Sequence, residues 1–156
     1  MAYTDIISVA DAKNYLRIDD TLSNDDQLIA VIINTAFQYI EKYTNVICVA
    51  TDKTYIYDDN NMVRVYDAPI NTETLPDHTE EYFYELYSIF EVSNSDIKDI
   101  TLNVGYELAT DVPSDIIMVA YELIDILYYG KETGKSMEDL SPLSRQTLDL
   151  NKRFLL

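Results

Sequence analysis

Histidine and cysteine, two residue types that often catalyse reactions or bind metals, are scarce in this chain. Its 156 residues include one histidine, His78, in a polar stretch, and one cysteine, Cys48. A histidine without a companion histidine or cysteine is usually a surface residue, and a lone cysteine forms neither an internal disulfide nor a thiolate metal cluster. The glycine-rich phosphate-binding motifs and the HExxH metal-binding motif are also missing. We therefore expect His78 at the surface and Cys48 as a small buried apolar residue.

Carboxylates are the abundant reactive groups, with 28 Asp and Glu residues. At this density, chance proximity explains any acid–base pair that could be chosen. The cluster of Asp19, Asp20, Asp25 and Asp26 suggests calcium, but a calcium-binding loop needs carboxylates at alternate positions, a central glycine and a final Glu. We predict no catalytic residue, no cofactor and no metal site, so the protein is not expected to be an enzyme. A metal-dependent carboxylate hydrolase is the enzymatic alternative.

The net charge of -17 is unevenly distributed along the chain. Residues 1–130 hold 6 Lys and Arg against 24 Asp and Glu, a balance of -18, whereas residues 131–156 hold 5 against 4, a balance of +1. DNA-binding proteins gain affinity from cations that displace counterions, so an acidic body repels a DNA backbone. Three interpretations stay open: the acidity keeps the protein soluble, lets DNA pass without binding, or imitates DNA itself.

Length and composition indicate a folded domain. A chain of 156 residues is long enough for one domain with a core, and 47% hydrophobic and 12% aromatic residues argue against disorder. No apolar run approaches the roughly twenty residues of a membrane span, and the N-terminus lacks the pattern of a secretion signal. We expect a soluble protein that is not secreted.

The longest helix is predicted from Ser23 to Asn45, where apolar residues recur at steps of three and four. Ser23 or Asn24 is expected to cap its first turn. Its expected apolar row consists of Leu28, Ile29, Ile32, Ile33, Ala36, Phe37, Ile40 and Tyr43. This one-faced helix is expected to be the element on which the rest of the chain packs.

Three shorter stretches also have helical patterns. One runs from Ser8 to Ile18, with Ser8 as its cap, and should neighbour the long helix. Another begins around Pro113, is apolar on two sides, and should end at Gly130 and Gly134. The last is a short helix from Pro142 to Asn151.

The middle of the chain changes to a period of two and to β-branched residues, which predicts a small antiparallel sheet. The expected strands lie within residues 46–58, which hold one or two of them, 62–67, 82–92 and 98–106. The strand at 62–67 returns from a polar turn at 58–61, a polar connector follows at 71–81, and the pattern of 82–92 also fits a helix. The predicted fold class is α+β, mainly α: a bundle of three main helices with a small antiparallel β insertion and a C-terminal extension. We divide the chain into a helical domain, residues 1–130 with the insertion at about 46–106, and a C-terminal tail, residues 131–156.

The ordered set of motifs resembles one known family, the phage head–tail connector proteins, also called head-completion or adaptor proteins. The resemblance covers about residues 6–130 and rests on ISVADAKNYLRID, DDQLI, AFQYIEKYTN, VRVYDAPI, ITLNVGY and DVPSDIIMVAYEL. The chain departs from the family where an Asn-Arg ending often follows the third helix, because it has Tyr128, Tyr129, Gly130 and Lys131 there. This departure bears on the docking partner more than on the fold.

The resemblance implies a structural virion protein that performs no reaction. Such a protein forms a ring of about twelve copies under the portal of a tailed phage, joins the head to the tail and extends the DNA channel. The implied partners are the portal protein, a downstream tail or second connector protein, and other copies of the chain, while genomic DNA passes through without specific binding and no membrane is involved. The implied location is the neck of the virion, after assembly in the bacterial cytoplasm.

The near-neutral tail is the candidate docking segment. It carries the cationic residues Arg145, Lys152 and Arg153 and the apolar residues Phe154, Leu155 and Leu156. This segment either becomes ordered on contact with a partner or packs on its own subunit. A protein of a different class, an acidic DNA mimic that inhibits a DNA-binding enzyme, is the alternative to the connector; it would bind its target in a salt-sensitive way.

Overall fold

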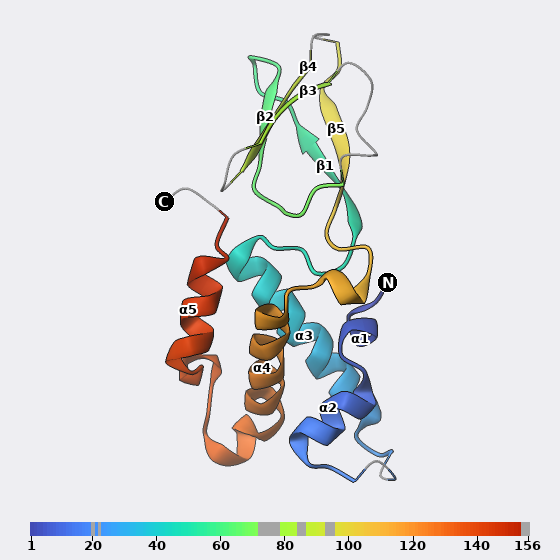
Figure 1. Cartoon of the computed structure of the whole chain (residues 1–156), viewed down its shortest axis with the longest axis vertical. Coiled ribbons are helices and arrows are strands. Elements are labelled where there is room, and N and C mark those ends of the chain that lie inside the picture. Colours follow the sequence, from blue (N-terminus) through green and yellow to red (C-terminus); the bar gives the residue numbers. More distant parts are fainter. Residues whose placement is uncertain (20, 22, 72–78, 84–86, 93–95, 154–156) are drawn as a thin grey trace.

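The computed structural model describes residues 1–19, 21, 23–71, 79–83, 87–92 and 96–153. The helices gather at one end of the molecule and the strands at the other, as Figure 1 shows. The chain enters the strand end after the third helix and returns from it before the fourth. The elements therefore form a helical part, built from both ends of the chain, and a β part inserted between them.

The helical part contains α1 (Tyr3–Ile6), α2 (Val9–Leu16), α3 (Asp26–Thr44), α4 (Ser114–Thr133) and α5 (Pro142–Leu150), with the short 3-10 helices η2 (Ala109–Asp111) and η3 (Met137–Asp139). The predicted cap of α2 is confirmed, because the Ser8 hydroxyl accepts the Asp11 N–H at 3.0 Å. Helix α5 lies where a short C-terminal helix was predicted.

The predicted cap of α3 is wrong. Asp25 occupies the N-cap position without a side-chain cap, and the Ser23 carbonyl accepts the Asp26 N–H at 3.3 Å. The carboxylates at this helix start serve tertiary contacts instead: Asp25 accepts the Tyr128 hydroxyl at 2.8 Å, and Asp26 pairs with Lys13. These contacts hold the start of α3 against α4 and α2.

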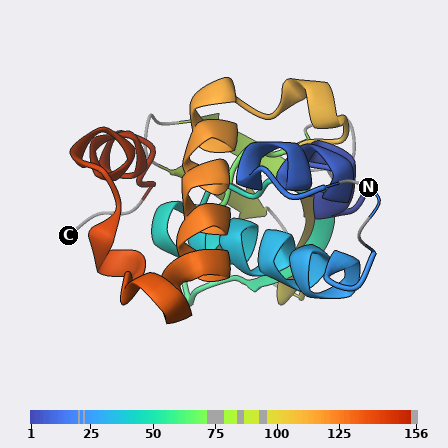
Figure 2. The ribbon, with the colours of Figure 1, turned by 90° about the horizontal axis from the view of Figure 1, so that it is seen from below.

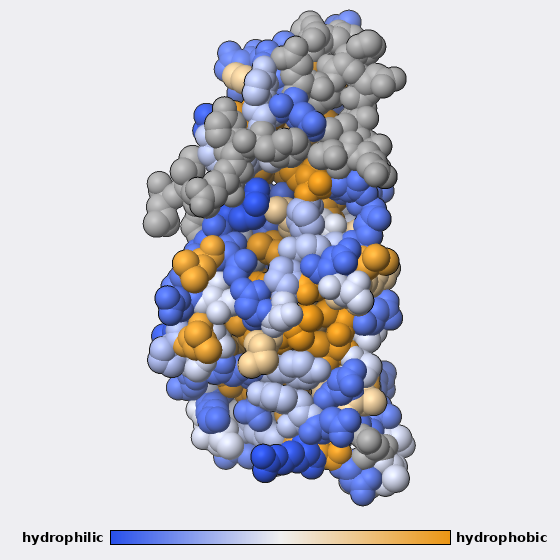
Figure 3. All heavy atoms as spheres, in the orientation of Figure 1, coloured by the Kyte–Doolittle hydropathy of each residue, from blue (hydrophilic) through white to orange (hydrophobic). Residues whose placement is uncertain are grey.

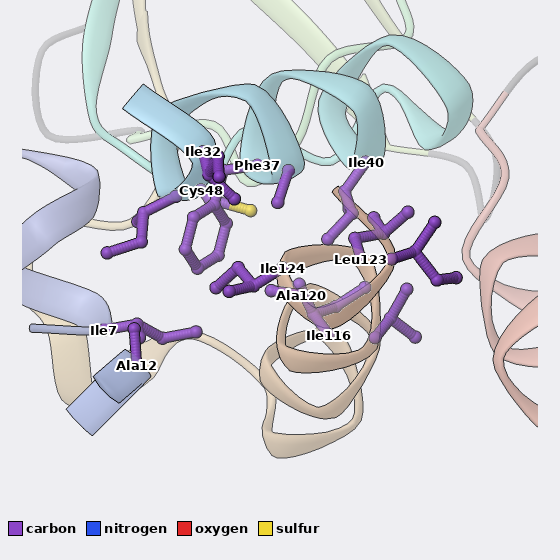
Figure 4. Close-up of a cluster of buried hydrophobic side chains, with 14 of the residues drawn as sticks. Ile7, Ala12, Ile32, Phe37, Ile40, Cys48, Ile116, Ala120, Leu123 and Ile124 are labelled. Atoms are coloured by element: carbon purple, nitrogen blue, oxygen red, sulfur yellow. The ribbon is translucent and has the colours of Figure 1, made fainter. Parts of the chain in front are cut away.

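The apolar row of α3 faces the core along most of its length. Ile29, Ile32, Ile33, Ala36, Phe37 and Ile40 are buried, and Figure 4 shows several of them facing Ile116, Ala120, Leu123 and Ile124 of α4. Leu28 is a correction to the predicted row, because 52% of it is exposed. Successive residues of a helix point about 100° apart. When Ile29 and Ile33 face the core, the neighbouring Leu28 therefore points to the outer side of the helix.

Of the two glycines predicted to end α4, Gly134 does so as its C-cap, whereas Gly130 lies within the helix, which continues to Thr133. Gly134 has a φ of 71°, and its N–H donates to the Gly130 carbonyl at 2.8 Å. Gly130 serves a close approach of backbones, since a Cβ there would lie 2.6 Å from the Lys135 carbonyl oxygen. The second glycine ends the helix and the first lets the chain fold back across it.

The β part contains β1 (Thr51–Ile56), β2 (Met62–Val65), β3 (Thr79–Phe83), β4 (Ser88–Val92) and β5 (Asp99–Val104). Strands β1 and β5 pair antiparallel, and β2, β4 and β3 form a second antiparallel sheet in that order. The clearest predicted strand is confirmed as β5, with Ile100, Leu102 and Val104 buried.

Two strand predictions are corrected. The stretch 82–92 was expected as one element, but it contributes to both β3 and β4, and β3 begins inside the expected connector at 71–81. The strand after the 58–61 turn pairs with β4 rather than returning along β1. In the register of this pair, buried Val63 of β2 lies opposite buried Phe90 of β4, so cross-strand apolar packing supports the pairing. Local patterns predict a strand but not its partner.

The predicted α+β fold, mainly α, is confirmed. Its helical and β parts have separate clusters of buried apolar residues. Among the helices that the structure describes, none is long and apolar enough to cross a membrane.

Helices α2 and α3 are neighbours, as predicted, and an ion pair joins them. The Lys13 side chain is 4% exposed and its ammonium pairs with the Asp26 carboxylate. The Asp26 side chain is 44% exposed, so the pair is buried only at its lysine end, and replacing Asp26 removes the charge that compensates the buried Lys13 ammonium.

We expect Asp26→Asn to lower the free energy of unfolding by about 1–2 kcal/mol, less than loss of a fully buried pair costs, because Asp26 is partly exposed to water and the amide oxygen still accepts a hydrogen bond. Denaturant unfolding at neutral pH measures the change. The control is Asp59→Asn in the exposed 58–61 turn, which should leave stability nearly unchanged. Equal stability of the two variants would contradict the structural role of the pair.

Candidate interface of the C-terminal segment

The C-terminal segment lies against its own subunit up to Arg153. Helix α5 contacts α4 and α3, and Leu140 and Leu148 belong to the buried cluster of the helical part. Figure 2 shows α5 beside α4 at the edge of the helical part. Of the two arrangements left open by the sequence, residues 140–153 adopt the one packed on the subunit itself.

Glu122 of α4 holds the start of α5. Its carboxylate accepts the Ser141 N–H at 2.6 Å and the Ser141 hydroxyl at 2.8 Å, and it also accepts the Ser144 hydroxyl. Burial by itself raises the pKa of Glu122, but the hydrogen bonds from Ser144 and Ser141 outweigh burial and hold this pKa below its ordinary value. The ionised carboxylate therefore anchors α5.

Lys152, one of the predicted docking residues, is engaged at the end of α5. Its ammonium lies 2.8 Å from an Asp149 carboxylate oxygen and 4.0 Å from the centre of the Tyr43 ring. The Tyr43 hydroxyl donates to the same carboxylate at 2.8 Å. These contacts tie the end of α5 to the last turn of α3.

Arg153 lies where the helical part meets the β part. Its N–H donates to the Thr44 carbonyl at 2.9 Å, and its Nε donates to the Tyr66 carbonyl at 3.2 Å. The Asn45 side-chain amide donates to the Arg153 carbonyl at 3.2 Å. Arg153 thus bridges the end of α3 and the chain after β2.

The predicted docking residues do not form one cluster. Lys152 and Arg153 line a hollow of about 280 Å³ together with Leu150 and Tyr106, whereas Arg145 lies on α5 with its Nε donating to the Leu140 carbonyl at 3.1 Å. Phe154, Leu155 and Leu156 lie outside the described residues. The hollow combines two cations with an apolar wall, which suits contact with a protein segment.

A second surface was missed by the sequence analysis. Tyr15, Met118 and Leu143 line a mainly apolar groove of about 320 Å³ between α2, α4 and α5. Met118 and Leu143 are well exposed, and Figure 3 shows apolar side chains reaching the surface in the helical part. The sequence signal for this groove is the apolar character of α4 on more than one side, a pattern that burial of the helix on two sides also produces.

The groups considered for chemistry are poorly placed for it. Cys48 is buried as predicted, and burial, with a smaller effect of Glu41, raises the pKa of its thiol to about 12. A thiol with this pKa stays protonated at neutral pH and is a poor nucleophile. Among the described residues, no group of three or more His, Cys, Asp and Glu side chains could hold a metal ion, and His78 lies outside them.

We expect Glu122→Gln to lower the free energy of unfolding at pH 7 by about 1–2 kcal/mol, because an amide replaces an ionised hydrogen-bond acceptor. A lowered pKa means that the wild-type carboxylate stabilises the fold above its ordinary pKa and loses this effect as the pH falls through the lowered value. The difference between variant and wild type should therefore shrink in acid. Urea unfolding at pH 7 and at an acidic pH tests this. The control is Glu132→Gln on the exposed side of α4. A difference that does not depend on pH would contradict the anchoring role of the charge.

Two of three comparisons with known proteins, with family models and with solved structures, give matches. Residues 6–75 match the family model described as phage gp6-like head-tail connector protein. A solved structure titled "Neck of empty GTA particle computed with C6 symmetry" contains a chain that is 13% identical, with a TM-score of 0.76, over 99% of this chain and 92% of that chain. A second, titled "Virion of native gene transfer agent (GTA) particle", contains a chain that is 13% identical, with a TM-score of 0.77, over 100% of this chain and 94% of that one.

At such low identity, the two structural matches show a shared fold. The comparison with curated proteins gave no match. The family match covers the stretch that contains α2, α3, β1 and β2. The resemblance found in the sequence is thus confirmed, because over residues 6–75 this chain carries the pattern of the phage gp6-like head-tail connector family.

Proposed function

We propose that this protein is a structural component of the neck of a tailed phage or phage-like particle, where it joins the head to the tail. The proposal rests on two independent matches that occur on the same chain. Residues 6–75 match the connector family, and the whole chain has the fold of chains from a neck and a virion. In this function the protein works through its interfaces and performs no reaction.

The proposed assembly is a ring of about twelve copies under the portal, which extends the DNA channel. The similar neck structure was computed with C6 symmetry, and twelve copies can be arranged with that symmetry. Each copy would contact its two neighbours, the portal protein above and a second connector or tail protein below. The ring would lie in the neck of the virion after assembly in the bacterial cytoplasm.

The charge of the chain suits a channel for DNA. A net charge of -17 per copy raises the energy of a polyanion held close to the wall, so DNA can pass without sticking. The near-neutral C-terminal segment, with Arg145, Lys152, Arg153 and the terminal Phe154, Leu155 and Leu156, is proposed to meet a partner protein. The partner would approach at the hollow beside Lys152 and Arg153.

The test is to mix the purified protein with the portal ring of the same phage and to image the product by electron microscopy. We expect an added ring of density on the outer end of the portal. A matched variant, Lys152→Ala with Arg153→Ala, tests the docking segment separately from the ring. If this segment meets the portal, the variant should form less of the complex, and a control substitution at exposed Lys135 should not.

An intact portal that gains no density would contradict docking at the portal. Salt-sensitive binding to a DNA-binding enzyme, measured in parallel, would then favour the DNA mimic. A thermal shift on addition of magnesium, manganese or calcium would favour the metal-dependent hydrolase.

A further inference from the structure

The outer face of α3 is free of negative charge although the protein is strongly acidic. Its exposed residues recur at steps of three and four and therefore share one side of the helix. They are Gln27, Leu28, Val31, Asn34, Thr35, Gln38 and Lys42. Leu28 is 52% exposed and Val31 56% exposed, and the one charged side chain of this face is a lysine. Such a face can approach another acidic molecule without like-charge repulsion.

The apolar groove between α2, α4 and α5 is a second surface with room for side chains. Its volume is about 320 Å³, and its exposed apolar members include Met118 at 67% and Leu143 at 71% exposure. Asp115 and Glu122 also line it, so its rim is acidic. The groove therefore complements the α3 face in two respects: it can take aliphatic side chains, and its carboxylates can face Lys42.

The two surfaces lie on opposite sides of the helical part. In Figure 2, α3 runs along the lower side, whereas α2, α5 and the start of α4 lie on the upper side. A closed ring needs two different, complementary surfaces on each copy, because each copy contacts its neighbours head to tail. The α3 face and the groove meet this requirement.

We propose that the outer face of α3 of one copy docks into the groove between α2, α4 and α5 of the next copy. This inference rests on the proposed ring function and adds the faces through which the copies meet. Charge favours a second copy of the chain as the molecule that docks in the groove. Contact between two molecules of charge -17 requires surfaces without opposed carboxylates, whereas a basic partner would favour a carboxylate-rich surface.

Substitutions by aspartate test the two faces. Leu28 lies in the first turn of α3 and Leu143 in the first turn of α5, where aspartate suits the helix dipole and the fold should persist. We expect Leu28→Asp and Leu143→Asp each to abolish ring formation on the portal and self-association in concentrated free protein. The matched control is Leu108→Asp, at a leucine that is 60% exposed outside both surfaces, which should assemble normally.

A mixture of the two variants shows whether the contact is head to tail. The Leu28→Asp copy keeps an intact groove and the Leu143→Asp copy keeps an intact α3 face, so the mixture should form dimers that grow no further. Sedimentation velocity measures the size of the species. Self-association of Leu143→Asp alone would instead indicate contact between two α3 faces and would overturn the proposal.

Cross-linking provides a second test that does not disturb the contact. A chain with Leu28→Cys and Leu143→Cys, treated with a short bismaleimide, should give a ladder of covalent multimers, whereas each single substitution should give no ladder. Cys48 can stay, because it is buried. The treatment is applied to rings on the portal and to concentrated free protein.

The outcomes separate this interface from the proposed function. A ring on the portal without the ladder overturns the interface and leaves the proposed function in place. A ladder in free protein that does not bind the portal supports the interface and contradicts docking at the portal. Absence of the ladder from both samples overturns the interface.

Discussion

The packing of α3 against α4 is the contact on which the rest of the structure depends. The two helices come from opposite sides of the β insertion, and their buried side chains form the centre of the helical part. Helices α1, α2 and α5 add to this pair, and the β part extends from its end. The apolar row of α3 therefore fixes both the core and the direction of its outer face, for which we propose contact with the next copy.

Because cationic side chains are few, the carboxylates of this acidic chain use other hydrogen-bond partners. With 11 Lys and Arg against 28 Asp and Glu, most carboxylates need other partners. Tyrosine hydroxyls supply several of them: Tyr3 donates to Glu41, Tyr43 to Asp149, Tyr55 to Asp67 and Tyr128 to Asp25. These four tyrosines partly bury their apolar rings, while their hydroxyls satisfy carboxylate acceptors without neutralising charge. This arrangement satisfies carboxylates without removing the negative charge, which suits the DNA channel that we propose.

The sequence predicted the features that depend on local periodicity. The row of α3, the cap of α2 and the alternation of β5 follow from residues close together in the chain. The errors arose where distant residues decide. Asp25 and Asp26 contact Tyr128 and Lys13 instead of leaving the cap to Ser23, and β2 pairs with β4, where buried Val63 lies opposite buried Phe90. The candidate docking residues followed from charge, but charge does not show that Arg153 bridges two parts of its own subunit, nor that Met118 and Leu143 line a groove.

The central claim, that this chain forms a ring in the neck, is tested most directly by electron cryomicroscopy of the neck of assembled particles that contain it. The claim predicts a ring of density below the portal into which copies of the helical and β parts fit, with the α3 face of each copy against its neighbour. A neck whose density is fully accounted for by other chains would contradict it.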